Sequence, residues 1–309
     1  MVAIWGPEGA ILSTRQDIKG IHIARSLGPQ DHAELWDSIH VSKDLKDSLL
    51  CQALLNFTLR PKVSRTVIPL HGIIMLVGKP GTGKTSLARG LASKTAGLLP
   101  AKKIAYLEVE PHSLSSSAMG RTQKAVTELF GQTIAEYAQA GPTFVLLDEV
   151  ETIAVDRSKL SLEANPIDIH RATDAALVQL DHLGEQYPNL LLVTTSNFQQ
   201  AIDSAFISRS DLLITIPLPD KHACKEILAD TLRGLSKAFP KVEELSHHRD
   251  LHKVAEACYG LDGRQIRKMV ASACTLHRET AADPNELKLD DLLRAAEKAV
   301  KERTTEGKV

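Results

Sequence analysis

Residues 75–85, MLVGKPGTGKT, constrain the fold of this chain more than any other stretch. An apolar run leads into a glycine-spaced loop that ends in lysine and threonine, which matches the P-loop pattern GxxxxGKS/T. Gly78, Gly81 and Gly83 allow tight backbone turns and let bare N–H groups approach phosphate oxygens, which a Cβ atom would obstruct. Lys84 supplies a positive charge for the β- and γ-phosphates. The stretch therefore predicts a site for a triphosphate.

The residues on either side of the loop support this interpretation. Residues 71–77 have the composition of a buried strand and residues 86–94 have helical spacing, so the loop leads to a helix N-terminus, where anions bind. The alternative, a glycine-rich turn that matches by chance, explains neither flank. We expect ATP as the ligand, with Thr85 binding Mg²⁺ and further contacts from Pro80, Thr82 and Ser86.

The composition fits a large globular chain. Its 309 residues are 43% hydrophobic and 24% charged, which is enough for a large core and more than one domain. Lys and Arg total 37 against 38 Asp and Glu, giving a net charge of −1. Without a long basic run, the sequence predicts no nucleic-acid partner.

The cysteines and the N-terminus indicate the compartment. Cys51, Cys224, Cys258 and Cys274 are widely spaced without a C-x-x-C motif, which predicts free, buried thiols rather than a zinc site or disulfides. The N-terminus lacks the basic and apolar regions of a secretion signal, and no window reaches membrane-spanning length. We therefore expect a cytoplasmic protein without a membrane partner.

A second motif lies at residues 143–150, TFVLLDEV, where an apolar run carries two acids near its end. Such a run is typical of a central strand buried on both faces, and ligands of open α/β sheets bind at the C-terminal ends of the strands. Asp148 is placed to hold Mg²⁺, while Glu149 can polarise a water for attack on the γ-phosphate. Acids that merely end a strand are the alternative, and the preceding apolar run favours a Walker B motif.

Asn197 follows a further buried strand, predicted at residues 190–195. An asparagine here can orient the attacking water or sense the γ-phosphate, whereas the alternative is a turn-forming asparagine, which is common after strands. Because three strand ends converge on one phosphate, the first interpretation is favoured.

The order of these segments predicts an α/β fold, in which a P-loop domain with a parallel sheet between helices precedes a small helical domain. The expected division is an arm with short strands at 1–33, the α/β domain at 34–219, helices at 220–301 and a polar tail at 302–309. Besides those above, we expect a strand at 103–109, a strand at 212–216, and helices at 122–140, 169–183, 221–235, 251–257, 263–278 and 289–301.

This order of motifs resembles the AAA+ ATPases, and more closely the pachytene checkpoint protein 2 family, which remodels HORMA domains. The resemblance covers roughly residue 34 to the end of the chain. It rests on these motifs: LWDSI at 35–39, GTGKTSL at 81–87, HSL at 112–114, DEVE at 148–151, TTSN at 194–197, Ala205-Phe206 with Arg209 and Asp211, and Gly260-Leu261 with Gly263-Arg264.

The resemblance implies a ring, usually a hexamer, that binds ATP between subunits. By matching position, Arg209 resembles the arginine finger that reaches a neighbour's γ-phosphate, and Arg264 resembles the sensor-2 arginine of a helical lid. Guanidinium groups suit these roles because phosphoryl transfer concentrates negative charge. Many relatives carry a second arginine three residues before the finger, where this chain has Phe206.

The resemblance also places two pore loops. The first corresponds to residues 114–121, with Ala118, Met119 and Gly120 at its tip, where the family carries an aromatic residue. The missing aromatic implies a softer grip, since a methionine thioether suits irregular partners. The second loop corresponds to residues 163–170.

The N-terminus is short compared with eukaryotic members, which carry a substantial N-terminal domain. The chain is similar in this respect to bacterial relatives in anti-phage (CBASS-type) nucleotide signalling. The implied partners are further copies of the chain and a HORMA protein, alone or together with a nucleotidyltransferase. Two alternatives stay open: an ATPase that acts on nucleic acid or another complex, as clamp loaders and transposition regulators do, and a nucleotide-gated scaffold.

Overall fold

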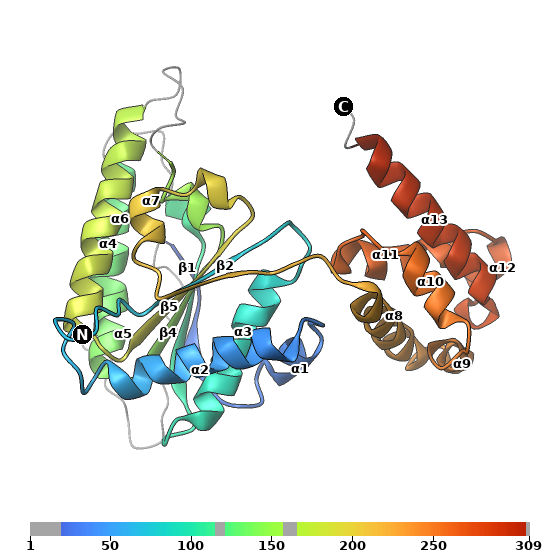
Figure 1. Ribbon diagram of the computed structural model, residues 1–309, viewed down its shortest axis with the longest axis horizontal. Coiled ribbons are helices and arrows are strands. Elements are labelled where there is room, and N and C mark those ends of the chain that lie inside the picture. The colour runs from blue at the N-terminus through green and yellow to red at the C-terminus, as the bar shows by residue number, and fades with distance from the viewer. Residues whose placement is uncertain (1–19, 115–120, 157–165, 307–309) are drawn as a thin grey trace. The chain divides into compact units, whose positions relative to one another are not determined.

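The computed structural model describes residues 20–114, 121–156 and 166–306 (Figure 1). Within these ranges the chain forms two compact units. The first unit comprises described residues of 20–36, 43–78 and 84–215, and the second comprises those of 37–42, 79–83 and 216–306.

The first unit is built on a six-stranded sheet with the strand order β1-β3-β4-β5-β2-β6. The strands are β1 Ile21–Leu27, β2 Ile73–Val77, β3 Ile104–Val109, β4 Thr143–Leu147, β5 Leu190–Ser196 and β6 Leu212–Thr215. All pairings from β3 to β6 are parallel, and every residue of β2, β3, β4 and β5 is buried. Burial on both faces explains their continuous apolar runs, and the predicted α/β fold class is confirmed.

One edge of the sheet differs from the prediction of a wholly parallel sheet. Strand β1, from the segment expected as an arm, pairs antiparallel with β3, with Leu27 opposite Ile104. The sheet is therefore mixed, as is common when an antiparallel strand covers the edge of a parallel sheet.

Helices cover both faces of the sheet (Figure 1). Helices α2 Lys43–Leu59 and α3 Lys84–Leu98 lie on one face, preceded by the short α1 Ala33–Asp37. Helices α4 Arg121–Glu128, α5 Ala135–Ala140 and α6 Pro166–Gln186 lie on the other, and the short α7 Ser204–Ile207 precedes β6. The single helix predicted at 122–140 is wrong in one respect, because a π-helical segment, Leu129–Ile134, separates α4 from α5. Gly131 of this segment packs against Gln179 of α6, where a Cβ would lie 2.7 Å from Oε1.

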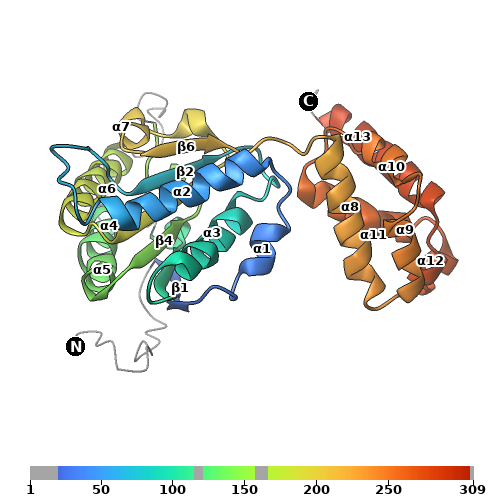
Figure 2. The same ribbon diagram turned by 60° about the horizontal axis from the view of Figure 1, so that its bottom comes forward.

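The second unit is a helical bundle with its own hydrophobic core (Figure 2). Its helices are α8 Lys221–Ser236, α9 Glu243–Ser246, α10 Leu251–Ala257, α11 Gly263–Cys274, α12 Arg278–Ala282 and α13 Leu289–Glu306. Asp220 caps α8 by accepting from the Ala223 N–H at 2.7 Å, and Asp262 forms a capping box with Gln265 at the start of α11. The helix predicted at 263–278 ends earlier, at Cys274, and the last helix extends beyond its predicted end at 301.

The structure also bears on two expectations from the sequence, those about the cysteines and about membrane-spanning segments. All four cysteines are free, but Cys51 is exposed and Cys274 is half-buried, so only Cys224 and Cys258 are buried as predicted. Burial raises the pKa of the Cys224 thiol to about 11 and that of Cys258 to about 12, which makes both inert. In the part of the chain that the structure describes, no helix has the length and apolar character needed to cross a bilayer.

Candidate active site

Lys84 opens helix α3 directly after the P-loop, and its side chain is fixed by two hydrogen bonds. Lys84 is 6% exposed, and its Nζ donates to the Gly78 carbonyl at 2.8 Å and to Asn197 Oδ1 at 2.8 Å. Gly78 follows β2 and Asn197 follows β5, so the ammonium group is held between two adjacent strand ends. A buried positive charge at a helix N-terminus suits phosphate binding.

The tip of the P-loop, residues 79–83, belongs to the second unit. Gly81 and Gly83 adopt left-handed φ angles of +80° and +89°. A Cβ on Gly81 would lie 2.2 Å from Asp262 Oδ1, and one on Gly83 would lie 2.6 Å from Ile39 Cδ1. Both positions therefore require glycine for conformation and for space. Arg264, in the first turn of α11, lies in this same unit.

Three oxygen-bearing side chains meet at the start of α3. Thr85 Oγ1 donates to Asp148 Oδ1 at 2.9 Å, and Thr195 Oγ1 donates to the same carboxylate oxygen. Hydroxyl and carboxylate oxygens are the ligands that Mg²⁺ takes, so the pair of Thr85 and Asp148 fits a bound Mg²⁺. Among the described residues, no group of three or more His, Cys, Asp or Glu side chains could hold a metal ion. Mg²⁺ ordinarily keeps several waters and binds through one or two protein groups together with substrate phosphates.

Glu149 leaves the line of β4 through a left-handed conformation, with φ 52° and ψ 54°. This conformation is uncommon outside glycine, and such residues gather at functional sites. Its Oε2 accepts a hydrogen bond from His112 Nε2 at 2.7 Å, and its Oε1 lies 3.4 Å from the Asn197 Nδ2 donor. A carboxylate only accepts hydrogen bonds, so the His112 ring donates here.

Three further residues shape the site without having been assigned a role from the sequence. His112 contacts Glu149, Thr195 accepts from the Glu149 N–H at 3.2 Å, and Glu151 Oε1 accepts from the Asn197 N–H at 3.1 Å. All three fall inside the motifs HSL, TTSN and DEVE. Thr195 could have been found from the two-residue spacing that places it on the same side of the chain as Asn197, whereas the other two contacts depend on the tertiary fold.

Arg209 is not brought to this site. It precedes β6, whose first residue pairs with Ile74 near the start of β2, while the P-loop follows the end of β2. The length of β2 places these two ends about 16 Å apart. Arg209 instead forms an ion pair with Asp181 of α6, at 2.7 Å between Nη2 and Oδ2.

Asp211 fixes the segment that carries Arg209. Its carboxylate, in a side chain that is 4% exposed, accepts from the backbone N–H groups of His71 at 2.8 Å, Gly72 at 2.6 Å and Ile73 at 3.1 Å. The Asp211 N–H donates to the Ile73 carbonyl at 2.8 Å. The turn before β6 is therefore attached to the beginning of the strand that leads to the P-loop.

We expect Asp211→Ala to lower the free energy of unfolding by about 2–4 kcal/mol, because it leaves three backbone donors without their charged acceptor. Urea denaturation of this variant and of Asp211→Asn measures the effect. The amide keeps one acceptor oxygen and should cost less. A loss below about 1 kcal/mol in Asp211→Ala would contradict the role given to the carboxylate.

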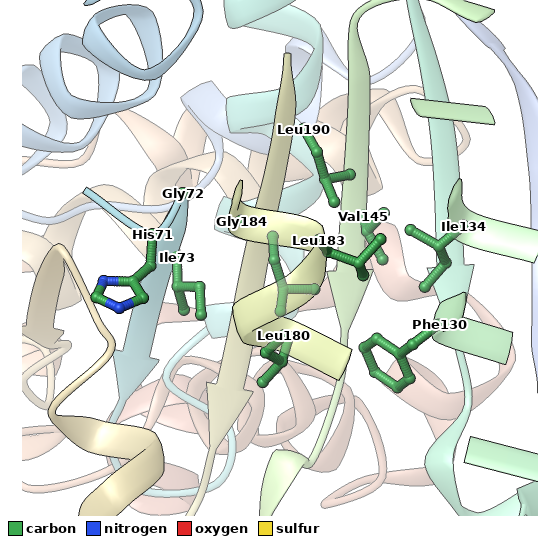
Figure 3. Close-up of a pocket in the computed structure, with 11 residues that line it drawn as sticks. His71, Gly72, Ile73, Phe130, Ile134, Val145, Leu180, Leu183, Gly184 and Leu190 are labelled. Atoms are coloured by element: carbon green, nitrogen blue, oxygen red, sulfur yellow. The ribbon is translucent and has the colours of Figure 1, made fainter. Parts of the chain in front are cut away.

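The pore-loop tip predicted from the sequence, Ala118, Met119 and Gly120, lies outside the described residues, as do residues 163–165 of the predicted second loop. Residues 166–170 of that loop are helical instead, because α6 begins at Pro166. An apolar cavity is present elsewhere in the first unit (Figure 3). It lies among Phe130, Leu180 and Leu183 and has a volume of about 10 Å³. A cavity of this size holds one water at most, so it is a gap in the core packing rather than a ligand site.

A P-loop between β2 and α3, an acid pair after β4 and an asparagine after β5 define the class of P-loop NTPases. The family model "ATPase family associated with various cellular activities (AAA)" matches residues 74–218. CD-NTase-associated protein 6 of Pseudomonas aeruginosa is 58% identical over 290 residues, covering 94% of this chain and 95% of that protein.

Further likenesses extend beyond the bacterial relative. The pachytene checkpoint protein 2 homologue of Danio rerio is 30% identical over 296 residues, covering 88% of this chain and 68% of that protein. The chain spans 57–68% of the length of the homologues of this name that it matches. A chain in the E. coli MS115-1 HORMA:CdnC:Trip13 complex has the same fold, with a TM-score of 0.68, 18% identity and coverage of 91% of this chain and 95% of that one.

The chain belongs to the AAA ATPases, within the family that includes CD-NTase-associated protein 6 and the pachytene checkpoint protein 2 homologues. The predicted family is confirmed. Membership implies nucleotide binding and ATPase activity in general.

Proposed function

We propose that this protein is an ATP-hydrolysing ring that remodels a HORMA-domain protein in the bacterial cytoplasm. The observation that carries the enzymatic part is the connected set of side chains from Lys84 through Asn197 to Glu149. These groups come from three chain segments and converge where parallel strands end, which is where ligands of α/β sheets bind.

Each residue then has a chemical role. The P-loop N–H groups and Lys84 bind the phosphates, while Thr85 and Asp148 hold Mg²⁺, which neutralises phosphate charge when bound. Glu149 accepts a proton from the attacking water, and Asn197 orients that water beside the γ-phosphate. His112 and Glu151 hold Glu149 and Asn197 in place through the hydrogen bonds described above.

Two arginines, Arg209 and Arg264, have proposed roles in the same reaction. Arg209 precedes β6 and so lies near the amino ends of the strands, whereas the P-loop follows the carboxyl end of β2; this separation supports a role for Arg209 at the site of a neighbouring subunit. We assign residues 34–219 to the ATPase domain and 220–301 to a helical lid, in which Arg264 contributes to the nucleotide site. A hexamer is the arrangement that the family resemblance implies.

The partner follows from the relatives. CD-NTase-associated protein 6 is named for an association with a CD-NTase, and the solved complex of similar fold contains HORMA, CdnC and Trip13. A HORMA protein, alone or with a nucleotidyltransferase, is therefore the substrate that we propose. Ala118, Met119 and Gly120 would engage it from the ring's pore, opening or disassembling its closed complex and so regulating anti-phage signalling.

A peptide-release assay tests this function. The HORMA protein from the genome that encodes this chain is loaded with a fluorescent closure peptide, and anisotropy is followed after the ring is added. We expect release with ATP and none with ADP, because only hydrolysis supplies the work of opening. Glu149→Gln with ATP should release nothing and should retain the HORMA protein on gel filtration. An intact complex with the wild type, together with no capture by Glu149→Gln, would contradict remodelling.

A further inference from the structure

The side chain of Arg209 is held from two directions. Its Nε donates to Asp181 Oδ1 at 2.8 Å and its Nη2 donates to Asp181 Oδ2 at 2.7 Å, which is a parallel bidentate pair. Its Nη1 donates to the Ala205 carbonyl at 2.6 Å. Since a guanidinium carries five N–H groups in one plane, these three bonds fix the plane and leave two N–H groups to donate elsewhere.

Asp181 is a rigid support for this pair. Its neighbours in α6, Leu180 and Leu183, are 4% and 2% exposed and belong to the main hydrophobic core. The Asp181 carbonyl also accepts from Arg65 Nη1 at 3.3 Å. The backbone that carries the carboxylate is therefore fixed in a helix that is packed against the sheet.

The pair lies at the surface of the first unit, with the side chains of Arg209 and Asp181 exposed by 23% and 43%. An ion pair this exposed contributes little to stability. The hydrogen bond from Arg209 keeps the pKa of Asp181 below its ordinary value, so the carboxylate is ionised at neutral pH. The geometry is thus better suited to orienting a side chain than to stabilising the fold.

We propose that Asp181 is a positioning residue that orients Arg209 for the ATP site of a neighbouring copy of the chain. The proposal rests on the proposed function, in which Arg209 acts between subunits. The bidentate contact occupies the Nε side of the guanidinium, and the two unassigned N–H groups are the ones that can meet a phosphate. Without Asp181, the arginine keeps its charge but loses its fixed direction.

Mixed rings test this proposal by separating the two partners of one site. Subunits with Glu149→Gln lack the base but keep Arg209, whereas subunits with Arg209→Ala lack the finger but keep the base. Co-expression with two affinity tags yields rings that contain both, and each Arg209→Ala site beside a Glu149→Gln subunit should regain ATPase activity. Recovery shows that Arg209 acts in trans.

Asp181→Ala is then placed in one kind of subunit at a time. In the Glu149→Gln subunit, which donates the arginine, it should lower the recovered kcat by roughly 10- to 100-fold, the effect of misplacing a group by about 1 Å. The KM for ATP should stay unchanged. In the Arg209→Ala subunit, Asp181→Ala should change nothing, because no arginine is there to orient.

Controls separate orientation from general damage. Glu185→Ala removes an exposed carboxylate one turn further along α6 and should have no effect in either subunit. Asp181→Asn keeps the size of the side chain but not the charged fork, and should lie between Asp181→Ala and wild type. Unchanged melting temperatures verify that the variants fold.

Two possible results would contradict different claims, namely the action of Arg209 between subunits and the positioning role of Asp181. If the mixture of Glu149→Gln and Arg209→Ala subunits recovers no activity, then the action of Arg209 between subunits fails, while the peptide-release assay decides the proposed remodelling separately. If activity recovers but Asp181→Ala lowers it equally in both kinds of subunit, in neither, or raises it in the donating subunit, then the positioning role alone is overturned.

Discussion

Glu149→Gln is expected to lower kcat for ATP hydrolysis by about 10²–10⁴-fold, the usual contribution of a general base. The amide has the same shape as the carboxylate but cannot take up a proton from the attacking water. Binding of ATP should be retained, because the contacts of Lys84 with Gly78 and Asn197 are untouched. Steady-state phosphate release gives kcat, and titration with a fluorescent ATP analogue gives the affinity.

The adjacent acid provides a matched control for this variant. Glu151 is two residues away but contacts only the backbone N–H of Asn197. Glu151→Gln should therefore lower kcat by a smaller factor than Glu149→Gln does. If Glu149→Gln kept more than a tenth of the wild-type rate, or if the two variants were equally impaired, then Glu149 would not be the base.

Arg209→Ala is expected to lower kcat by about 10³–10⁵-fold, as removal of a finger arginine does in other phosphoryl-transfer enzymes. In the proposed assembly each active site receives an arginine from a neighbouring subunit. The loss of activity should therefore appear although Arg209 lies far from the P-loop of its own subunit. Affinity for ATP should change little, because Arg209 meets charge that develops during the reaction. Arg209→Lys should also lose most activity, since a lysine cannot reproduce the fork.

Arg171→Ala serves as the control, because Arg171 is an exposed arginine on α6 and has no assigned role. Its kcat should match that of the wild type. Analytical ultracentrifugation with ATP should show the same assembly for both variants, so that lost activity is not lost association. An Arg209→Ala protein that hydrolyses ATP at the wild-type rate would contradict the finger assignment.

The central strands and the acids at their ends could be predicted because local signals suffice there. An apolar run such as TFVLL is long enough for a strand buried on both faces, and the acids that follow it must lie at the carboxyl end of that strand. The P-loop motif is equally local, since the left-handed φ angles of Gly81 and Gly83 favour glycine whatever the surroundings. These parts of the fold and of the site needed no knowledge of distant residues.

The remaining features depend on contacts between distant segments. Strand β1 pairs with β3 although about eighty residues separate the two, and its sequence alternates only weakly. The π-helical segment contains Gly131, which lies against Gln179 of α6, and helical periodicity does not report this contact. The contact of His112 with Glu149 and that of Arg209 with Asp181 each join side chains more than twenty-five positions apart, which periodicity does not report.

Asp211 attaches the segment that carries Arg209 to the beginning of β2, and the P-loop follows the end of the same strand. This arrangement restricts the symmetry of any assembly in which Arg209 of one subunit reaches the P-loop of another. A two-fold interface brings the same patch of both subunits together, and here the donating and receiving patches lie at opposite ends of two adjacent strands, β6 and β2. In the proposed ring the contact is head-to-tail, so the donating patch of one subunit meets the receiving patch of the next. Head-to-tail contacts either close into a ring or continue as a helical filament, depending on the rotation between neighbouring subunits. In a closed ring every ATP site receives an arginine, whereas in a filament the site at one end receives none.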